Sequence, residues 1–184
     1  MGVVAYFTAE IGLWSELHTY SGGLGVLAGD HVKSAADDEL PLVGVTLLYR
    51  RGYGRQHLDQ NGIQTETYRD LDPAKHLKDT GVILSLPLDG TELLARVWKA
   101  EIRGVTGHTV PVFFLDTFHP ENSERHLNLG LTLYGGDDWV RIRQEYLLGV
   151  GGVRLLEQMG YDVDGLHLNC LLYTSDAADD SACV

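Results

Sequence analysis

Cysteine is scarce in this sequence, and the positions of the two cysteines exclude two kinds of site. Cys170 and Cys183 both lie in the last fifteen of the 184 residues. The residues before them therefore offer no disulfide and no thiolate metal ligand. The eight histidines show no paired ligand spacing either, so we expect no metal site. A chain without disulfides is typical of the cytoplasm, which we take as the expected compartment.

Basic residues are also few. Fourteen lysines and arginines stand against 26 aspartates and glutamates, which gives a net charge of −12. Such a chain repels nucleic-acid backbones and anionic membranes, so a neutral ligand, or an anion held by local donors, fits better. No apolar run approaches the ~18 to 20 residues that cross a bilayer, and the N-terminus lacks the features of a secretory signal. The length and the 44% hydrophobic content predict about one globular domain.

The last fifteen residues differ from the rest of the chain. Residues 170–184 contain three aspartates but no basic residue, no glycine and no clear periodicity. We therefore divide the chain into a domain at residues 1–169 and a tail at residues 170–184. The string from Cys170 to Asp180 resembles the translation of a transposase adapter used in sequencing libraries, which indicates a read-through tail. The alternative is a genuine, acidic and poorly ordered terminus.

Two apolar runs near the start of the chain have the length and composition of buried strands. Residues 3–7 and 42–49 are short and apolar, as in parallel strands covered on both faces. Between them, a glycine-rich loop at 21–25 opens a segment of roughly helical spacing that continues to Glu39. A strand, helix, strand order favours an α/β fold with a parallel sheet. The positions that carry the helical spacing are Val26, Leu27, Gly29, Val32, Ala35 and Ala36.

Turn signals dominate the middle of the chain. Gln-Asn-Gly-Ile at 60–63 and Leu-Asp-Gly-Thr at 88–91 are typical of type I′ turns between extended segments. We therefore expect an inserted region of antiparallel β-hairpins from about residue 53 to residue 102. The parallel sheet is expected to resume with a buried strand at 109–115, where Pro111 counts against a central position.

A long helix is predicted from Asp138 to Met159, because apolar residues recur there at helical spacing. The glycines at 149, 151 and 152 weaken a helix and indicate close packing against a neighbouring element. Asp138 suits the N-cap of this helix, and Gly160 suits its C-terminus. Residues 165–169 then begin another strand.

The glycine cluster at 21–25 is a candidate anion site. At a helix start that follows a strand and a loop, backbone N–H groups are free and the helix dipole adds partial positive charge. The cluster matches neither the Walker pattern nor the full G-x-G-x-x-G fingerprint, so nucleotide motifs do not apply. A tight turn for close packing is the alternative. Glu10 lies just past the first strand, where open α/β sheets place ligands, although a solvated loop glutamate is the alternative.

For the other charged residues we expect simpler roles than ligand binding. Asp30 and His31 lie inside the first predicted helix, and we expect Asp30 to face solvent rather than a site. Arg141, Arg143 and Glu145 lie in the long helix, where two arginines form a candidate basic stripe for a phosphate. Alternating charges on a helix are usually a solvated face, which we favour here.

Four ordered blocks of the sequence carry a further signal. They are YFTAEIGL at 6–13, YSGGLGVLAGDH at 20–31, LYRRGY at 48–53, and LYGGD at 133–137 followed by RIRQE at 141–145. Together they resemble the α-glucan phosphorylases, which act on glycogen, starch or maltodextrin, particularly their shorter bacterial form. The resemblance runs from about Val3 to Asn169. In that family His-Leu-Asn is typically followed by Glu-Gly-His, whereas Cys170 stands here, which fits a truncated chain.

The resemblance implies a two-lobed glycosyltransferase of the GT-B type, of which residues 1–169 would form part of the Rossmann-like N-terminal lobe. The implied reaction is phosphorolysis, in which inorganic phosphate attacks the terminal α-1,4-glucosyl unit of a glucan and releases α-D-glucose 1-phosphate with retained configuration. The implied cofactor is pyridoxal 5′-phosphate, anchored to a lysine and acting through its own phosphate group. That lysine belongs to the C-terminal lobe and is absent from this chain, so we expect no activity from the fragment alone.

The resemblance also implies roles for particular residues. Glu10 matches an active-site glutamate that helps to order the phosphate-binding residues, and Asp137 falls near a gate loop that touches the glucosyl site. The helix start whose N–H groups face phosphate and glucosyl unit comprises Gly22, Gly23, Leu24 and Gly25. Gly12 and Val26 depart from the aromatic residue and the arginine of the family's long form. The family includes allosteric enzymes, and the full-length parent is expected to be homo-oligomeric.

Two other classes remain as alternatives. A nucleotide-sugar glucan synthase also begins with a Gly-Gly-Leu-Gly loop, but a lysine and a threonine usually precede it, whereas Tyr20 and Ser21 do here. A stand-alone carbohydrate-binding domain is expected to expose aromatic platforms. Trp14, Trp98 and Trp139 are too scattered in the sequence to indicate one.

Overall fold

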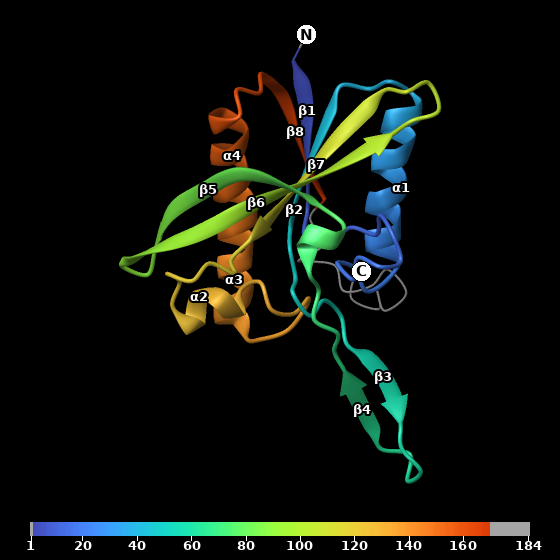
Figure 1. The fold of residues 1–184 in the computed structure, drawn as a ribbon, viewed down its shortest axis with the longest axis vertical. Helices are drawn as coiled ribbons and strands as arrows, with labels where there is room; N and C mark the ends of the chain where they lie inside the picture. Colours follow the sequence, from blue (N-terminus) through green and yellow to red (C-terminus); the bar gives the residue numbers. More distant parts are fainter. Residues whose placement is uncertain (1, 170–184) are drawn as a thin grey trace, which may run out of the picture.

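The computed structural model describes residues 2–169, so the tail at 170–184 lies outside the described residues. The chain forms a mixed α/β structure around a six-stranded sheet with the strand order β5-β6-β7-β2-β1-β8 (Figure 1). A separate two-stranded sheet, β3-β4, extends away from the main sheet. The strands of the main sheet are β1 (Val3–Thr8), β2 (Leu42–Leu47), β5 (Lys78–Leu88), β6 (Thr91–Arg103), β7 (Thr109–Asp116) and β8 (Val163–Asn169).

Four neighbouring strands of the main sheet are parallel. β1 pairs with β2 on one side and with β8 on the other, and β2 pairs in parallel with β7. Tyr6 of β1 lies opposite Gly44 of β2 and His167 of β8. The predicted parallel sheet is therefore confirmed for these four strands.

Helices cover both faces of this sheet (Figure 1). α1 (Gly23–Asp37) packs on the face that includes Tyr6, and a continuous helical segment packs on the face that includes Phe7. That segment consists of α3 (Asp138–Tyr146), a π-helical turn η2 (Leu147–Gly151) and α4 (Gly152–Gln158). Each face has its own hydrophobic core, so β1, β2 and β7 are mostly buried on both sides, as their apolar sequences predict, whereas β8 is largely exposed.

The inward face of α1 differs from the predicted one at two positions. Val26 and Leu27 are 46% and 59% exposed, so their predicted place in the helical core spacing is wrong. Gly25, Ala28, Gly29 and Val32 instead form the buried row at the spacing i, i+3, i+4, i+7, which leaves the two residues after Gly25 pointing away from the sheet.

The predicted long helix is confirmed with a change of hydrogen-bonding pattern in its middle. Its N-cap is Asp137, whose Oδ1 accepts from the N–H of Val140 at 3.1 Å, so the assignment of the cap to Asp138 is wrong by one residue. The helix ends in a Schellman motif around Gly160, where Tyr161 N–H bonds to Leu156 O at 2.9 Å. Gly160 is thus confirmed as the helix stop.

Close packing explains two of the three glycines in this helix. A Cβ on Gly152 would collide with the ring of Phe7, and a Cβ on Gly151 would lie 3.0 Å from Leu86 Cδ1. A Cβ on Gly149 would meet nothing within 4 Å, so the packing role predicted for that residue is wrong. The helix therefore approaches β1 and β5 closely through its π-helical turn and the residue after it.

The hairpin β5-β6 is an extension of the main sheet. Its turn residues Asp89 and Gly90 both have positive φ, which confirms the type I′ turn. β6 pairs antiparallel with β7 over eight residue pairs, so this half of the predicted insertion belongs to the sheet rather than standing apart from it. Pro111 lies in the central strand β7, one residue before the register with β2 begins, so only β6 pairs beside it.

The second hairpin forms a projecting arm. β3 (Arg55–Leu58) and β4 (Gln64–Thr67) pair only with each other, and every residue from 55 to 70 is exposed. The predicted type I′ turn is wrong here, because Gly62 alone has positive φ and the loop spans Asp59 to Ile63. The Asp59 carboxylate accepts from the N–H groups of Asn61 and Ile63, both at 2.8 Å, which stabilises the longer loop. Two short helices complete the fold: η1 (Pro73–Lys75) and α2 (Glu124–Asn128).

Candidate functional site

The carboxyl ends of the four parallel strands meet at one edge of the sheet. β1 lies at the centre of this edge, because the chain proceeds from β1 to β2 on one side and returns to β8 on the other. In open α/β sheets, ligands bind outside the carboxyl ends of strands at such a reversal of strand order. The residues that directly follow β1 are Ala9 and Glu10, so the fold places the predicted Glu10 at this crevice.

Glu10 is a buried acceptor that joins three segments of the chain. Glu10 is only 1% exposed. Oε2 accepts from the backbone N–H of Ser21 at 2.6 Å and lies 3.4 Å from the Ser21 hydroxyl. Oε1 accepts from the Tyr134 hydroxyl at 2.9 Å, across 124 positions of sequence. A buried carboxylate needs such donors, so Glu10 fixes the loop before α1 against the loop before α3.

The glycine cluster after Ser21 serves two different purposes. Gly22 is the N-cap of α1 and provides no side-chain cap, and a Cβ on Gly22 or Gly23 would meet nothing within 4 Å. Gly25 is buried, and a Cβ there would collide with Tyr20 and lie 3.1 Å from Glu10 Oε2. The first two glycines thus leave the helix start open for an anion, whereas the third allows close packing.

Tyr134 is held in an unusual backbone conformation. Its φ is +57°, which is uncommon for a bulky residue. Burial and then the neighbouring Glu10 carboxylate raise the pKa of the Tyr134 hydroxyl above its ordinary value, so it remains a proton donor at neutral pH. The residue before it, Leu133, is held to the segment that follows β2, because its N–H donates to Gly52 O at 3.1 Å. Tyr134 is therefore held in two ways: its hydroxyl donates to Glu10, and its neighbour Leu133 is bonded to Gly52.

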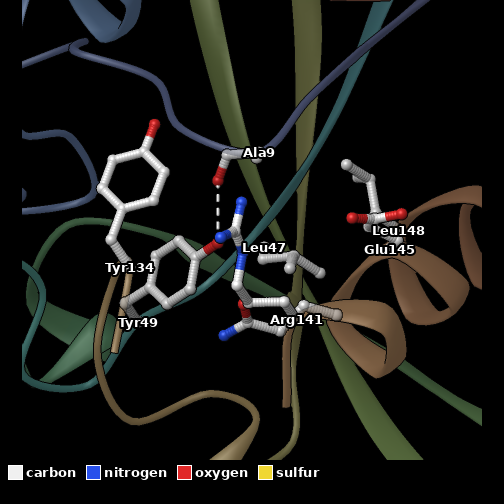
Figure 2. A pocket seen from close by; sticks show the side chains of 8 residues that line it. Ala9, Leu47, Tyr49, Tyr134, Arg141, Glu145 and Leu148 are labelled. Carbon is white, nitrogen blue, oxygen red and sulfur yellow. Dashed lines mark hydrogen bonds between the residues drawn. The ribbon is translucent and has the colours of Figure 1, made fainter. Parts of the chain in front are cut away.

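A small internal space lies beneath the crevice (Figure 2). Its volume is about 10 Å³, roughly one water molecule. Tyr49 closes it and donates to Ala9 O at 3.0 Å, and burial raises the pKa of the Tyr49 hydroxyl. Arg141 and Glu145 of α3 line the same space, which places the predicted basic stripe partly at this site. No lysine lies among the described residues that line it.

Arg143 and Asp137 make their contacts away from the crevice at Glu10. Arg143 forms a two-pronged ion pair with Asp89 in the β5-β6 turn, with both N to O distances 2.6 Å, so it does not turn toward the crevice. Asp137 caps α3 and lines a separate open depression of about 370 Å³, together with Arg125 and Trp139. The structure therefore brings Glu10 to the start of α1 but gives Asp137 a capping contact, and its gate-loop role stays a prediction.

His31 faces inward from α1, whereas Asp30 is exposed as expected. The His31 ring packs against Tyr6 at 4.7 Å and His167 at 5.2 Å between ring centroids. Its Nε2 atom is buried and has no hydrogen-bond partner within residues 2–169. Burial, and then the neighbouring His167, lower the pKa of His31, so the neutral form is favoured.

Sequence reasoning missed two contacts that complete this edge of the sheet. Tyr134 was not a candidate, and its only sequence signal is its position three residues before Asp137 in a glycine-rich loop. Asn169, at the end of β8, donates from Nδ2 to the Tyr6 hydroxyl at 3.0 Å and to Thr8 Oγ1 at 3.3 Å. Its sequence signal is its position at the carboxyl end of the predicted strand at 165–169, where ligands bind in open α/β sheets.

Within residues 2–169, every helix is too short or too polar to cross a bilayer. No group of three or more His, Cys, Asp or Glu side chains in that range is arranged to hold a metal ion.

Comparison with known proteins extends the site description. No family model matches the chain. The chain is 45% identical over 161 residues to a glycogen phosphorylase of Mycobacterium tuberculosis, covering 83% of this chain and 18% of that protein. It is 37% identical over 173 residues to a maltodextrin phosphorylase of Thermococcus litoralis, covering 90% of this chain and 20% of that protein.

A third relative is a glycogen phosphorylase of Aquifex aeolicus, 34% identical over 173 residues, with 90% of this chain and 24% of that protein covered. The chain thus spans about a fifth of the length of the relatives it matches. The resemblance to glycogen and maltodextrin phosphorylases that the four sequence blocks predict is confirmed.

Proposed function

We propose that this chain, a homologue of glycogen and maltodextrin phosphorylases over most of its length, is a fragment of an α-1,4-glucan phosphorylase. The parent enzyme would transfer the terminal glucosyl unit of a glucan to inorganic phosphate and release α-D-glucose 1-phosphate. The chain would contribute part of the Rossmann-like N-terminal lobe of a GT-B glycosyltransferase. Four parallel strands with helices on both faces support this assignment, since that arrangement binds ligands at its carboxyl edge.

The observation that carries the proposal is the contact between Glu10 and the start of α1. Glu10 holds the N–H of Ser21 at 2.6 Å, which orients the chain immediately before the exposed N–H groups of Gly22 and Gly23. Backbone N–H groups fixed at a helix start bind an oxyanion without reorganising during the reaction. In this proposal Glu10 is a positioning residue, and the helix start contacts the phosphate and the glucosyl unit.

The cofactor is assigned to another part of the parent protein. Phosphorolysis of this kind uses pyridoxal 5′-phosphate, whose own phosphate group supports proton transfer when the cofactor is bound. The resemblance to phosphorylases implies that the lysine that anchors this cofactor belongs to the C-terminal lobe, outside this chain. We therefore propose that the fragment is inactive alone. We propose separately, from the resemblance, that the parent is a cytoplasmic homo-oligomer.

The test compares the 184-residue chain with the full-length protein encoded by its complete reading frame. We expect the full-length protein, loaded with pyridoxal 5′-phosphate, to release glucose 1-phosphate from maltodextrin and phosphate. The fragment should release none. Turnover by the fragment alone would contradict the assignment of the cofactor lysine to another part of the protein. Glucan extension from a nucleotide sugar by the full-length protein, without phosphorolysis, would instead indicate the glucan synthase class.

A second measurement tests the role of Glu10 in the full-length protein. Glu10→Gln leaves the side-chain volume but weakens acceptance from Ser21 and Tyr134, and we expect kcat/KM for phosphate to fall about 10²-fold. The matched control is Glu121→Gln, because Glu121 is exposed and its carboxylate makes no contact among residues 2–169. Equal activity of the two variants would remove Glu10 from the site.

A further inference from the structure

A depression gathers basic side chains at the base of the β3-β4 arm. It has a volume of about 40 Å³, where one water needs ~10 to 15 Å³. Its lining residues, which we call the arginine depression, are His18, Arg51, Tyr53, Arg55, Thr67 and Arg69. Three of the ten arginines of an acidic chain therefore lie around one space.

The depression lies where β3 begins and β4 ends. Arg55 of β3 lies directly opposite Thr67 of β4. Tyr53 and Arg69 lie just outside the two strands, and both line the same depression as Arg55 and Thr67. The face of β4 opposite Thr67 carries Glu66, whose carboxylate accepts from the Tyr68 hydroxyl at 2.7 Å.

The positive charge of the depression is only partly balanced by the protein. Arg51 forms an ion pair with Asp70 at 3.1 Å, but the Asp70 side chain is 84% exposed, so solvent screens that pair. The Arg55 and Arg69 guanidiniums have no carboxylate and no hydrogen-bond acceptor within residues 2–169. Neighbouring guanidiniums repel one another, and a bound anion would relieve that repulsion.

We infer that the arginine depression binds a small dianionic oxyanion, either inorganic phosphate or the phosphate group of a monoester. Guanidinium groups match the geometry of phosphate oxygens with paired N–H donors. Tyr53 and Thr67 also line the depression, where the Thr67 hydroxyl lies 3.0 Å from His57 Nε2. The depression, of about 40 Å³, has room for a compact group such as phosphate. The neutral glucan proposed as substrate requires no such set of cations.

This site is separate from the crevice at Glu10. No residue that lines the arginine depression lines the small space beneath the crevice. The two are nevertheless joined through the backbone, because Arg51 N–H bonds to Leu131 O at 2.8 Å in the loop that leads to Tyr134. The inference does not depend on the proposed function, so its test reads anion binding rather than phosphorolysis.

The experiment uses the full-length protein and labels its accessible arginines with phenylglyoxal, with peptide mass spectrometry as the readout. Labelling is compared in phosphate, in glucose 1-phosphate and in sodium chloride of equal ionic strength. We expect either phosphate compound to slow labelling of Arg55 and Arg69 about tenfold relative to chloride, the effect of one charge-assisted hydrogen bond. Arg103, an exposed residue on β6, should label equally in all three solutions.

A double variant, Arg55→Gln with Arg69→Gln, provides the second measurement. Both residues are exposed, so we expect the variant to fold. Calorimetric titration with inorganic phosphate should show one fewer binding site in this variant than in the unchanged protein, whereas Arg103→Gln should keep the full number. Protection by the monoester alone would support the inference with an ester as ligand. Equal labelling of Arg55 and Arg69 in all three solutions would overturn it.

Discussion

The two β-hairpins in the middle of the chain follow similar Asx-Gly turn signals but have opposite fates. β5-β6 joins the main sheet, and Leu84, Leu86 and Leu93 on its inner face are at most 4% exposed. β3-β4 leaves the main sheet, and Leu58 on it is 74% exposed. A turn signal predicts where the chain reverses, whereas alternating apolar residues decide whether the hairpin is covered.

Tethers to the rest of the molecule separate the hairpins further. Asp116, buried at the end of β7, accepts from Arg50 at 2.7 Å and from the Trp98 indole at 2.9 Å, which joins β6 to the segment after β2. At the base of the arm, the side-chain ion pair of Arg51 with Asp70 is exposed, and backbone hydrogen bonds such as Arg51 N–H to Leu131 O hold its ends. The sheet hairpin is therefore part of the folding unit, while the arm is attached to it through its ends.

The strongest challenge to this comparison is a matched pair of leucine truncations. Leu93→Ala on β6 removes a fully buried side chain, and we expect the free energy of unfolding to fall by about 3 to 4 kcal/mol. Leu58→Ala on the exposed arm should change it by less than about 0.5 kcal/mol. Denaturant unfolding of both variants measures the difference. Similar losses would show that the arm is part of the cooperative core after all.

A second pair of variants compares the tethers. Asp116→Ala leaves Arg50 without its carboxylate and the buried Trp98 N–H without an acceptor, so the free energy of unfolding should fall by about 2 to 3 kcal/mol. Asp70→Ala removes only the exposed pair with Arg51 and should cost less than about 1 kcal/mol. Thermal unfolding in low and high salt checks both values. A large loss for Asp70→Ala would assign the arm a structural tether.

Much of the fold is readable from local sequence because the responsible forces are local or repetitive. The runs at 3–7 and 42–49 predict buried parallel strands, since only strands covered on both faces carry uninterrupted apolar residues. Val26 and Leu27 mislead for the opposite reason. Apolar character alone does not select which side of a helix is buried. Gly25 and Gly29, with no side chain, permit the close approach of α1 to Tyr20 and Gly12 in the loop that follows β1.

Only part of the candidate site could be predicted from the sequence. Glu10 is predicted by its place after β1, because the end of a parallel strand fixes the position of the next residues. Tyr134 reaches Glu10 from 124 residues away through a positive φ, and neither the distance nor the conformation is encoded in local propensity. Asp137 lies in the same loop but turns to cap α3. Tertiary contacts therefore decide which polar residue of a loop meets the crevice.

The turns themselves provide a third comparison, of smaller size. Gly90 and Gly62 have positive φ of 79° and 76° in the two hairpins, so alanine strains the backbone at either position. Gly90→Ala should lower the global free energy of unfolding by about 1 to 2 kcal/mol, because β5-β6 unfolds with the sheet. Gly62→Ala should leave that value unchanged and only speed proteolysis within residues 55–67. A global loss from Gly62→Ala would contradict the independence of the arm.

The smallest expected effect concerns pH and the turn of β5-β6. The Asp89 carboxylate accepts from Arg143 of α3, and this hydrogen bond lowers the pKa of Asp89 below its ordinary value. A lowered folded-state pKa gives stability that is present above the unfolded-state pKa and is lost as the pH falls through the folded-state pKa. Asp89→Asn keeps the left-handed turn but removes the charge. The unchanged protein should therefore be slightly more stable than Asp89→Asn at pH 7, and the difference should vanish once Asp89 is protonated in acid.

Asp59→Asn in the arm loop is the control and should show no such pH-dependent difference in global unfolding, because its carboxylate contacts only the loop itself. A pH-dependent loss from Asp59→Asn would mean that the arm loop reports on the stability of the sheet.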